Sequence, residues 1–162
     1  MSGRPLPDIA AILAPLLGGV RPLERPLLLA IAERMAADRY RSWASEVDDA
    51  DARAGLLACA DREDEIAARV EGVYPDAAAV QERLRAAHPD LASINAEIFA
   101  GRPLAEQFTI QAGGERLGAA TWRTLAAATS AAGARAAFLA CAPLEEASAE
   151  FLEALLERNL IG

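Results

Sequence analysis

The chain has 162 residues and a formal net charge of −8, and all 16 of its basic residues are arginines. This length suits one domain, 1–162, which can bury most of its apolar surface without disulfides or a zinc cluster. The acidic balance argues against nucleic acid and against an anionic membrane as partners, because phosphate binding depends on clustered basic residues.

Alanine, leucine and glutamate dominate, and no segment alternates β-branched with polar residues. The sequence therefore predicts an all-α fold. A first helix is expected over 8–18, because Gly18 and Gly19 end its apolar pattern. Its apolar residues favour packing onto the rest of the chain over an oligomer contact.

Residues 27–73 read as a helical hairpin. Its first helix is expected to reach about Val47, and Asp49 is one of several aspartates that can cap the second helix. That helix should continue to Val73, since Pro75 disfavours helix just before it.

The segment 74–103 reads as a crossover with short helices at about 77–87 and 91–99. A second hairpin, 104–160, follows, with its helices at about 104–129 and 134–160.

Cys59 and Cys141 lie in apolar helical runs, where a free cysteine behaves as a small core residue. With neither a signal peptide nor a membrane span expected, the sequence predicts a cytoplasmic protein.

An internal repeat relates the two hairpins. Between Ala30 and Glu71, 17 of 42 positions are identical to the positions 82 residues later, and seven of these are Glu, Arg or Cys. Two copies of a helical hairpin joined by a long connection predict a four-helix bundle whose equivalent residues face one axis. Glu33 then corresponds to Glu115, and Glu63 corresponds to Glu145.

Glu63 and Glu145 each lie on an otherwise apolar stripe, and burying an unpaired carboxylate there is costly. In the second helix of the first hairpin the stripe holds Leu56, Cys59, Glu63, Ile66 and Val70. Phe138, Cys141, Glu145, Ser148 and Leu152 repeat it in the last helix. The sequence leaves open whether Glu145 or its neighbour Glu146 is the carboxylate that points into the bundle.

These residues resemble the rubrerythrin-type members of the ferritin-like superfamily. The likeness rests on Glu33 with Tyr40 and, later, Glu63, and on Glu115 with Trp122 and, later, Glu145. It implies an antiparallel four-helix bundle from a duplicated hairpin, with a long crossover and, outside the likeness, an extra N-terminal helix. In that family one Glu from each of two helices and a Glu-x-x-His from each of the other two hold a di-iron or di-manganese centre.

The chain departs from that pattern at both histidine positions, which hold Ile66 and Ser148. The only histidine, His88, lies in the crossover and is expected at the surface. Two interpretations follow. In one, Glu33, Glu63, Glu115 and Glu145 hold a hard cation or weakly bound Fe or Mn through oxygen alone.

In the other interpretation the site has decayed, and the acids are satisfied by protonation, by hydroxyls such as those of Tyr40 and Ser148, or by Arg39. At least one clustered carboxylate then has a raised pKa. The sequence favours this second view: a divergent, non-catalytic binding or assembly protein without a cofactor, forming a homodimer with no identified protein partner. The alternative is a carboxylate-only metal-binding protein with residual iron or manganese redox or iron-handling activity.

Overall fold

The computed structural model describes residues 4–158, and no strand occurs in that range. The predicted all-α class is confirmed. Its α-helices are α1 (Ile9–Gly18), α2 (Arg25–Glu46), α3 (Ala50–Glu71), α4 (Ala77–Ala87), α5 (Leu91–Phe99), α6 (Leu104–Ala128) and α7 (Ala132–Glu157), with one 3-10 turn, η1, at Pro22–Glu24.

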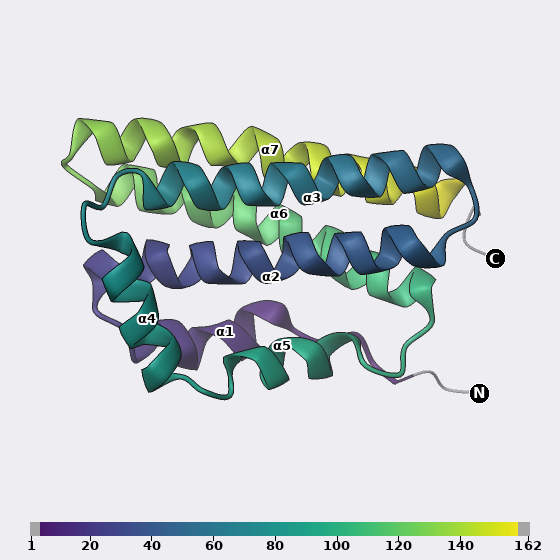
Figure 1. Ribbon diagram of the computed structural model, residues 1–162, viewed down its shortest axis with the longest axis horizontal. Helices are drawn as coiled ribbons and strands as arrows, with labels where there is room; N and C mark the ends of the chain where they lie inside the picture. The colour runs from purple at the N-terminus through teal and green to yellow at the C-terminus, as the bar shows by residue number, and fades with distance from the viewer. Residues whose placement is uncertain (1–3, 159–162) are drawn as a thin grey trace.

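The long helices α2, α3, α6 and α7 lie side by side (Figure 1). α2 packs along α3, α6 packs along α7, and α3 contacts α7. Side chains join α2 to α6: the indole Nε1 of Trp43 donates to Oε1 of Gln107 at 2.9 Å. These contacts give the long helices a shared interior.

The helix boundaries follow the local signals in the sequence. Asp8 caps α1 by accepting a hydrogen bond from the Ala11 backbone N–H, and Asp49 caps α3 in the same way at Ala52. α3 ends at Glu71, two residues before the expected end, and α7 begins two residues early at Ala132. The expected end of the last helix, at 160, lies outside the described residues.

The N-terminal helix and the crossover form a second layer. α1, α4 and α5 lie on the side of α2 that faces away from α3 and α7 (Figure 1). Ile9 and Ile12 of α1 pack against the main apolar cluster, so the expectation that this helix docks on its own chain is met. The layer covers one side of the long helices.

The two stripes expected on α3 and α7 are buried along their whole length. Every residue of both stripes is buried, including Glu63, Glu145 and both cysteines. Cys59 and Cys141 are free, and burial raises the pKa of each thiol to about 12. Neither thiol is therefore reactive near neutral pH.

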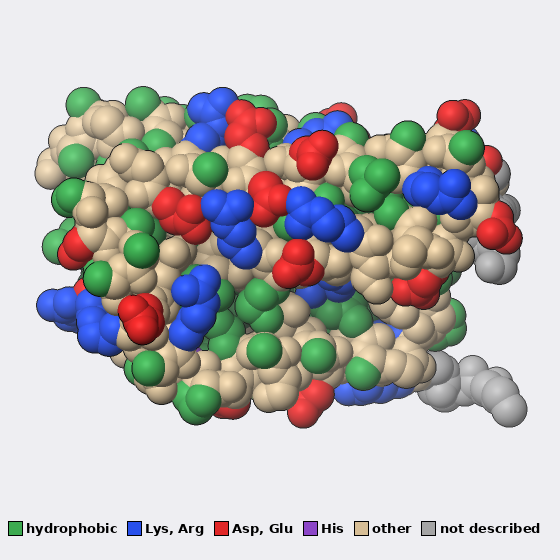
Figure 2. Space-filling view, in the orientation of Figure 1, with side chains coloured by type: hydrophobic (Ala, Val, Ile, Leu, Met, Phe, Trp, Pro, Cys, Tyr) green, Lys and Arg blue, Asp and Glu red, His purple; other side chains and the backbone are tan. Residues whose placement is uncertain are grey.

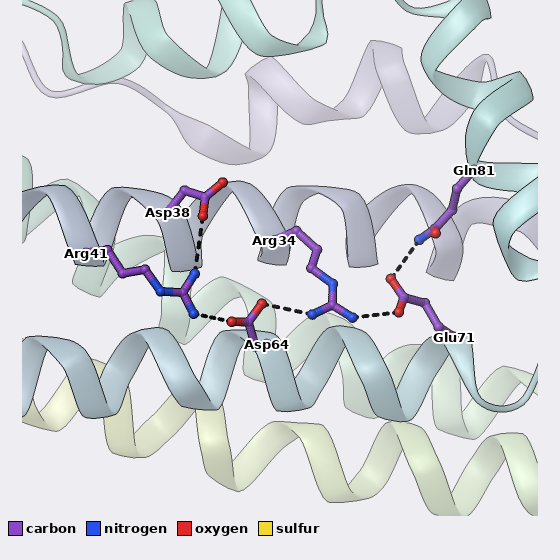
Figure 3. A network of polar contacts seen from close by, with 6 residues as sticks. All are labelled: Arg34, Asp38, Arg41, Asp64, Glu71 and Gln81. Atoms are coloured by element: carbon purple, nitrogen blue, oxygen red, sulfur yellow. Dashed lines mark hydrogen bonds and ion pairs between the residues drawn. The ribbon is translucent and has the colours of Figure 1, made fainter.

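Charged side chains of both signs are interspersed on the outer face of α2 and α3 (Figure 2). Arg34 of α2 donates to Asp64 at 2.9 Å and to Glu71 at 2.7 Å, both on α3 (Figure 3). Arg41 also pairs with Asp64. Gln81 of α4 donates to Glu71 at 3.1 Å. This outer network ties α2, α3 and α4 together.

Within residues 4–158, no helix is both long enough and apolar enough to cross a membrane.

Candidate metal site

Four glutamates, one from each long helix, meet in the shared interior. Glu63, Glu115 and Glu145 are exposed by only 0%, 2% and 1%, and Glu33 is partly buried. One carboxylate oxygen from each of Glu33, Glu63 and Glu145 lies within 4.8 Å of the other two. Glu145 is also within hydrogen-bonding contact of Glu115. The structure thus brings the four acids together, while their role as metal ligands stays a prediction.

The inward residue of the pair at 145 and 146 is Glu145. Glu146 is only partly buried, and it accepts from Arg123 of α6 at 2.7 Å on the outer surface. The apolar stripe on α7 explains the choice, because one helical step of about 100° moves Glu146 off that stripe.

Gly118 of α6 makes room for the Glu145 carboxylate. A Cβ at position 118 would lie 2.5 Å from Oε1 of Glu145 and 2.7 Å from its Cδ. Because real Cβ atoms do not approach that closely, any larger residue would move the carboxylate. The glycine is therefore part of the site, although it offers no ligand atom.

Glu115 is the acid with the most hydrogen-bond donors. The hydroxyl of Tyr40 donates to Oε1 of Glu115 at 2.7 Å, and Nε2 of Gln111 donates to the same oxygen at 2.6 Å. Gln111 in turn accepts on its Oε1 from Arg39, at 3.1 Å from Nε and 3.0 Å from Nη2. Arg39, whose guanidinium lies 4.1 Å from the ring centroid of Phe99, thus reaches the cluster only through an amide.

Glu145 and Glu63 each receive one donor. The indole Nε1 of Trp122 donates to Oε1 of Glu145 at 2.8 Å, and the hydroxyl of Ser148 donates to Oε1 of Glu63 at 3.1 Å. Such bonds to one oxygen orient a carboxylate and leave its other oxygen available, as the outer partners of metal ligands do.

The second oxygen of Glu63 has no partner. Its Oε2 is the one buried side-chain nitrogen or oxygen in residues 4–158 without a hydrogen bond. Leaving a buried polar atom unpaired costs about 1–3 kcal/mol, and more when the group is charged. The orphaned atom belongs to a cluster of acids, so a cation or a proton is the chemical species that would satisfy it.

Burial and mutual repulsion disfavour ionisation of these acids. Burial raises the pKa of Glu33 to about 7, and the negative charge of Glu115 adds to the effect. Burial also raises the pKa of Glu63 well above its usual range, with Glu115 and Glu33 contributing. The pKa of Glu145 is raised well above its usual range by burial and then by Glu33. The expected raised pKa in the cluster is present.

Ile66 and Ser148 stand at the two positions where the rubrerythrin-type pattern has histidine, and their surroundings differ. Ile66 is fully buried in an apolar cluster with Trp122, while Ser148 is the hydroxyl donor to Glu63. His88 is the C-cap of α4 in the crossover, and it is partly buried. The protein ligands available to a metal here are thus oxygens alone.

Sequence reasoning named Tyr40, Ser148 and Arg39 as possible partners of the acids. Tyr40 and Ser148 do donate to carboxylates, whereas Arg39 bonds to Gln111 instead. Gln111 itself was missed. Its position four residues before Glu115 was the available signal, because residues four apart on a helix are neighbours.

Comparison with protein-family models, with characterised proteins and with solved structures finds no match for this chain.

Proposed function

We propose that this protein binds one hard divalent cation through Glu33, Glu63, Glu115 and Glu145, and that it is a divergent ferritin-like protein built from a duplicated helical hairpin. Manganese and weakly held ferrous iron are the cations that we propose for this site, since sites made only of carboxylate oxygens suit hard metals. The role is cation binding, because the imidazoles that suit iron redox chemistry are absent from the positions of Ile66 and Ser148.

The unpartnered Oε2 of Glu63 carries the proposal. It is buried without a hydrogen-bond partner, and oxygens of two other carboxylates, those of Glu33 and Glu145, gather with Glu63. Oxygens bound to one ion at about 2.0–2.6 Å can be at most roughly 4–5 Å apart. The 4.8 Å limit within which oxygens of Glu33, Glu63 and Glu145 gather suits a single shared ion after small side-chain movements.

The contrast with the surface acids supports the same reading. Asp64 is paired with Arg34 and Arg41 (Figure 3). Glu146 is paired with Arg123. Within residues 4–158, no arginine donates a hydrogen bond to the four interior acids. Arg39 lies near them but donates to Gln111 instead. A bound cation would supply the missing positive charge.

A second candidate is a metal-free binding or assembly protein with a decayed site. The donors Tyr40, Trp122 and Ser148 favour it, because they satisfy one oxygen on each of three acids without any metal. In that case protonation of the cluster, with the pKa of Glu33 raised to about 7, replaces the cation.

Metal analysis and thermal unfolding separate the two. Protein purified without chelators or metal-affinity steps is expected to contain near-stoichiometric Mn or Fe. After EDTA treatment, adding Mn²⁺ should raise the melting temperature, since a ligand at 100 times its dissociation constant stabilises the folded state by about 2.7 kcal/mol.

Two glutamine variants and a matched control sharpen the test. Glu63→Gln and Glu33→Gln should each lose the Mn²⁺-dependent rise, whereas Glu150→Gln, at an exposed position on α7, should keep it. Metal-free protein whose melting temperature is unchanged by 1 mM Mn²⁺ would overturn the cation proposal and favour the decayed site. An equal rise in all three variants would place the cation elsewhere.

A further inference from the structure

A cavity of about 260 Å³ lies between α1, α2, α5 and α6, next to the carboxylate cluster. Its walls are mostly apolar, and the charged side chains that line it are those of Glu33, Glu115, Glu145 and Arg39. The volume is that of roughly nine water molecules at about 30 Å³ each. This space is just below the usual size range of small-molecule pockets, and such pockets are likewise largely apolar with a few convergent polar groups.

α1 forms the outer wall of the cavity. Ile9, Leu13 and Leu17, spaced four residues apart on one face, all line it. Yet no residue of α1 is buried. An apolar helix face usually buries its side chains against a core. Here part of that face lies over hollow space instead.

Hydrogen bonds at both ends keep α1 in place over this space. The buried guanidinium of Arg102 donates to the carbonyl oxygens of Arg4 at 3.3 Å and Pro5 at 2.9 Å, just before the helix. At the other end, Nε of Arg25 donates to the carbonyl oxygen of Leu17 at 2.9 Å. The position of α1 therefore does not depend on filling the cavity with side chains.

Gly114 of α6 keeps part of the cavity open. It lines the cavity, and a Cβ added there would meet no atom within 4 Å. A glycine inside a helix costs about 0.5–1 kcal/mol relative to alanine. No neighbouring helix approaches closely enough to require a glycine at this position. The effect of the glycine is therefore to leave the space in front of it empty.

We propose that this cavity binds a small, hydrocarbon-rich molecule that has one hydroxyl group and no negative charge, with the hydroxyl at the carboxylates and the hydrocarbon beneath α1. The apolar walls favour a hydrocarbon body. Carboxylate oxygens accept hydrogen bonds from a hydroxyl, whereas they repel an anionic ligand. The proposal holds whether or not the acids bind a cation.

Proton NMR of the two tryptophan indole N–H groups tests it, using 1-hexanol as the probe and EDTA-treated protein. Trp122 lines the cavity, and Trp43, whose indole donates to Gln107, does not. 1-Hexanol should shift the Trp122 resonance saturably and leave the Trp43 resonance nearly unchanged. Hexanoate, whose carboxylate is repelled by the acids, should bind at least about tenfold more weakly, the factor that 1.4 kcal/mol corresponds to.

Adjacent glycines provide a matched control. Gly114→Leu should fill the cavity and abolish the saturable Trp122 shift. Gly113→Leu should preserve it, because Gly113 does not line the cavity and instead lines a neighbouring hollow of about 290 Å³ between 6–10 and α6. Ala32→Phe, which fills the cavity from α2, is a second blocking variant.

Three results would overturn the proposal: no saturable shift in the parent protein, an undiminished shift in both folded blocking variants, or binding of hexanoate that is as tight as that of 1-hexanol. Because EDTA is present throughout, these results are independent of the Mn²⁺ titration. A failed cation proposal therefore leaves this test intact.

Discussion

The halves 30–71 and 112–153 place their glutamates alike but surround them differently. In the second half, Glu115 accepts from two side chains, Tyr40 and Gln111. Its counterpart Glu33 has Leu29 where Glu115 has Gln111, and the polar groups that gather with it are the carboxylates of Glu63 and Glu145.

The aromatic residues at equivalent positions explain much of this difference. Tyr40 reaches across to Glu115 in the other half, while Trp122 bonds to Glu145 in its own half. Both donors therefore serve acids of the second half. Glu33 is left as the partly buried, cavity-lining acid whose pKa is raised to about 7. The comparison teaches that two similar sequence segments can place an acid at equivalent positions without placing the same hydrogen-bond donors around it.

The largest expected effect comes from removing the two aromatic donors. Trp122→Phe should lower the free energy of unfolding by roughly 3 kcal/mol, because it removes the donor to Glu145 and leaves unfilled space in a buried site. Tyr40→Phe should cost only about 1.5 kcal/mol, since Gln111 still donates to Glu115. Urea unfolding at pH 7.5 in EDTA measures both, and equal costs would contradict the asymmetry between the halves.

A smaller effect is expected from pH. The pKa of Glu33 is raised from 4.5 in the unfolded chain to about 7 in the folded protein, so its contribution to stability is present at low pH and lost as pH rises through 7. Between pH 5.5 and 8 the loss from Glu33 alone is about 2 kcal/mol. The raised pKa values of Glu63 and Glu145 add to the decline within this range and extend it to higher pH.

Unfolding of EDTA-treated protein across that pH range is the measurement, and Glu33→Gln should reduce the slope while the part due to Glu63 and Glu145 remains. Glu24, whose pKa is lowered to about 2 by Arg83 and Arg21, does not titrate in this window and adds no slope. A parent protein equally stable at pH 5.5 and 8 would refute the assignment. Saturating Mn²⁺ should flatten the curve if the acids bind a cation.

The smallest effect separates two glycines of α6. Gly114→Ala should stabilise the protein by about 0.4–1 kcal/mol, because alanine reduces the entropy of the unfolded chain and meets no atom in the folded one. Gly118→Ala should destabilise it by about 1 kcal/mol or more, because its Cβ would displace the Glu145 carboxylate. Thermal unfolding compares the pair, and a stabilised Gly118→Ala protein would show that the close contact is harmless.

Local signals in the sequence determined much of this protein. Alanine and leucine content set the all-α class, prolines and aspartates marked where helices begin, and helical spacing put Glu63 and Glu145 on buried stripes. The 82-residue repeat indicated that four acids share one interior. These inferences succeeded because they depend on neighbours along the chain or on one helix face.

Tertiary structure alone decided which donor serves which acid and where space is left. Nothing in the repeat predicts that Tyr40 crosses to Glu115 while Trp122 stays with Glu145. Nor does the pattern of α1 reveal that Leu13 and Leu17 face a cavity, since a periodic apolar face looks the same over a filled core and over a hollow. Both outcomes depend on distances of a few ångströms between helices far apart in the sequence, and helical periodicity does not encode those distances.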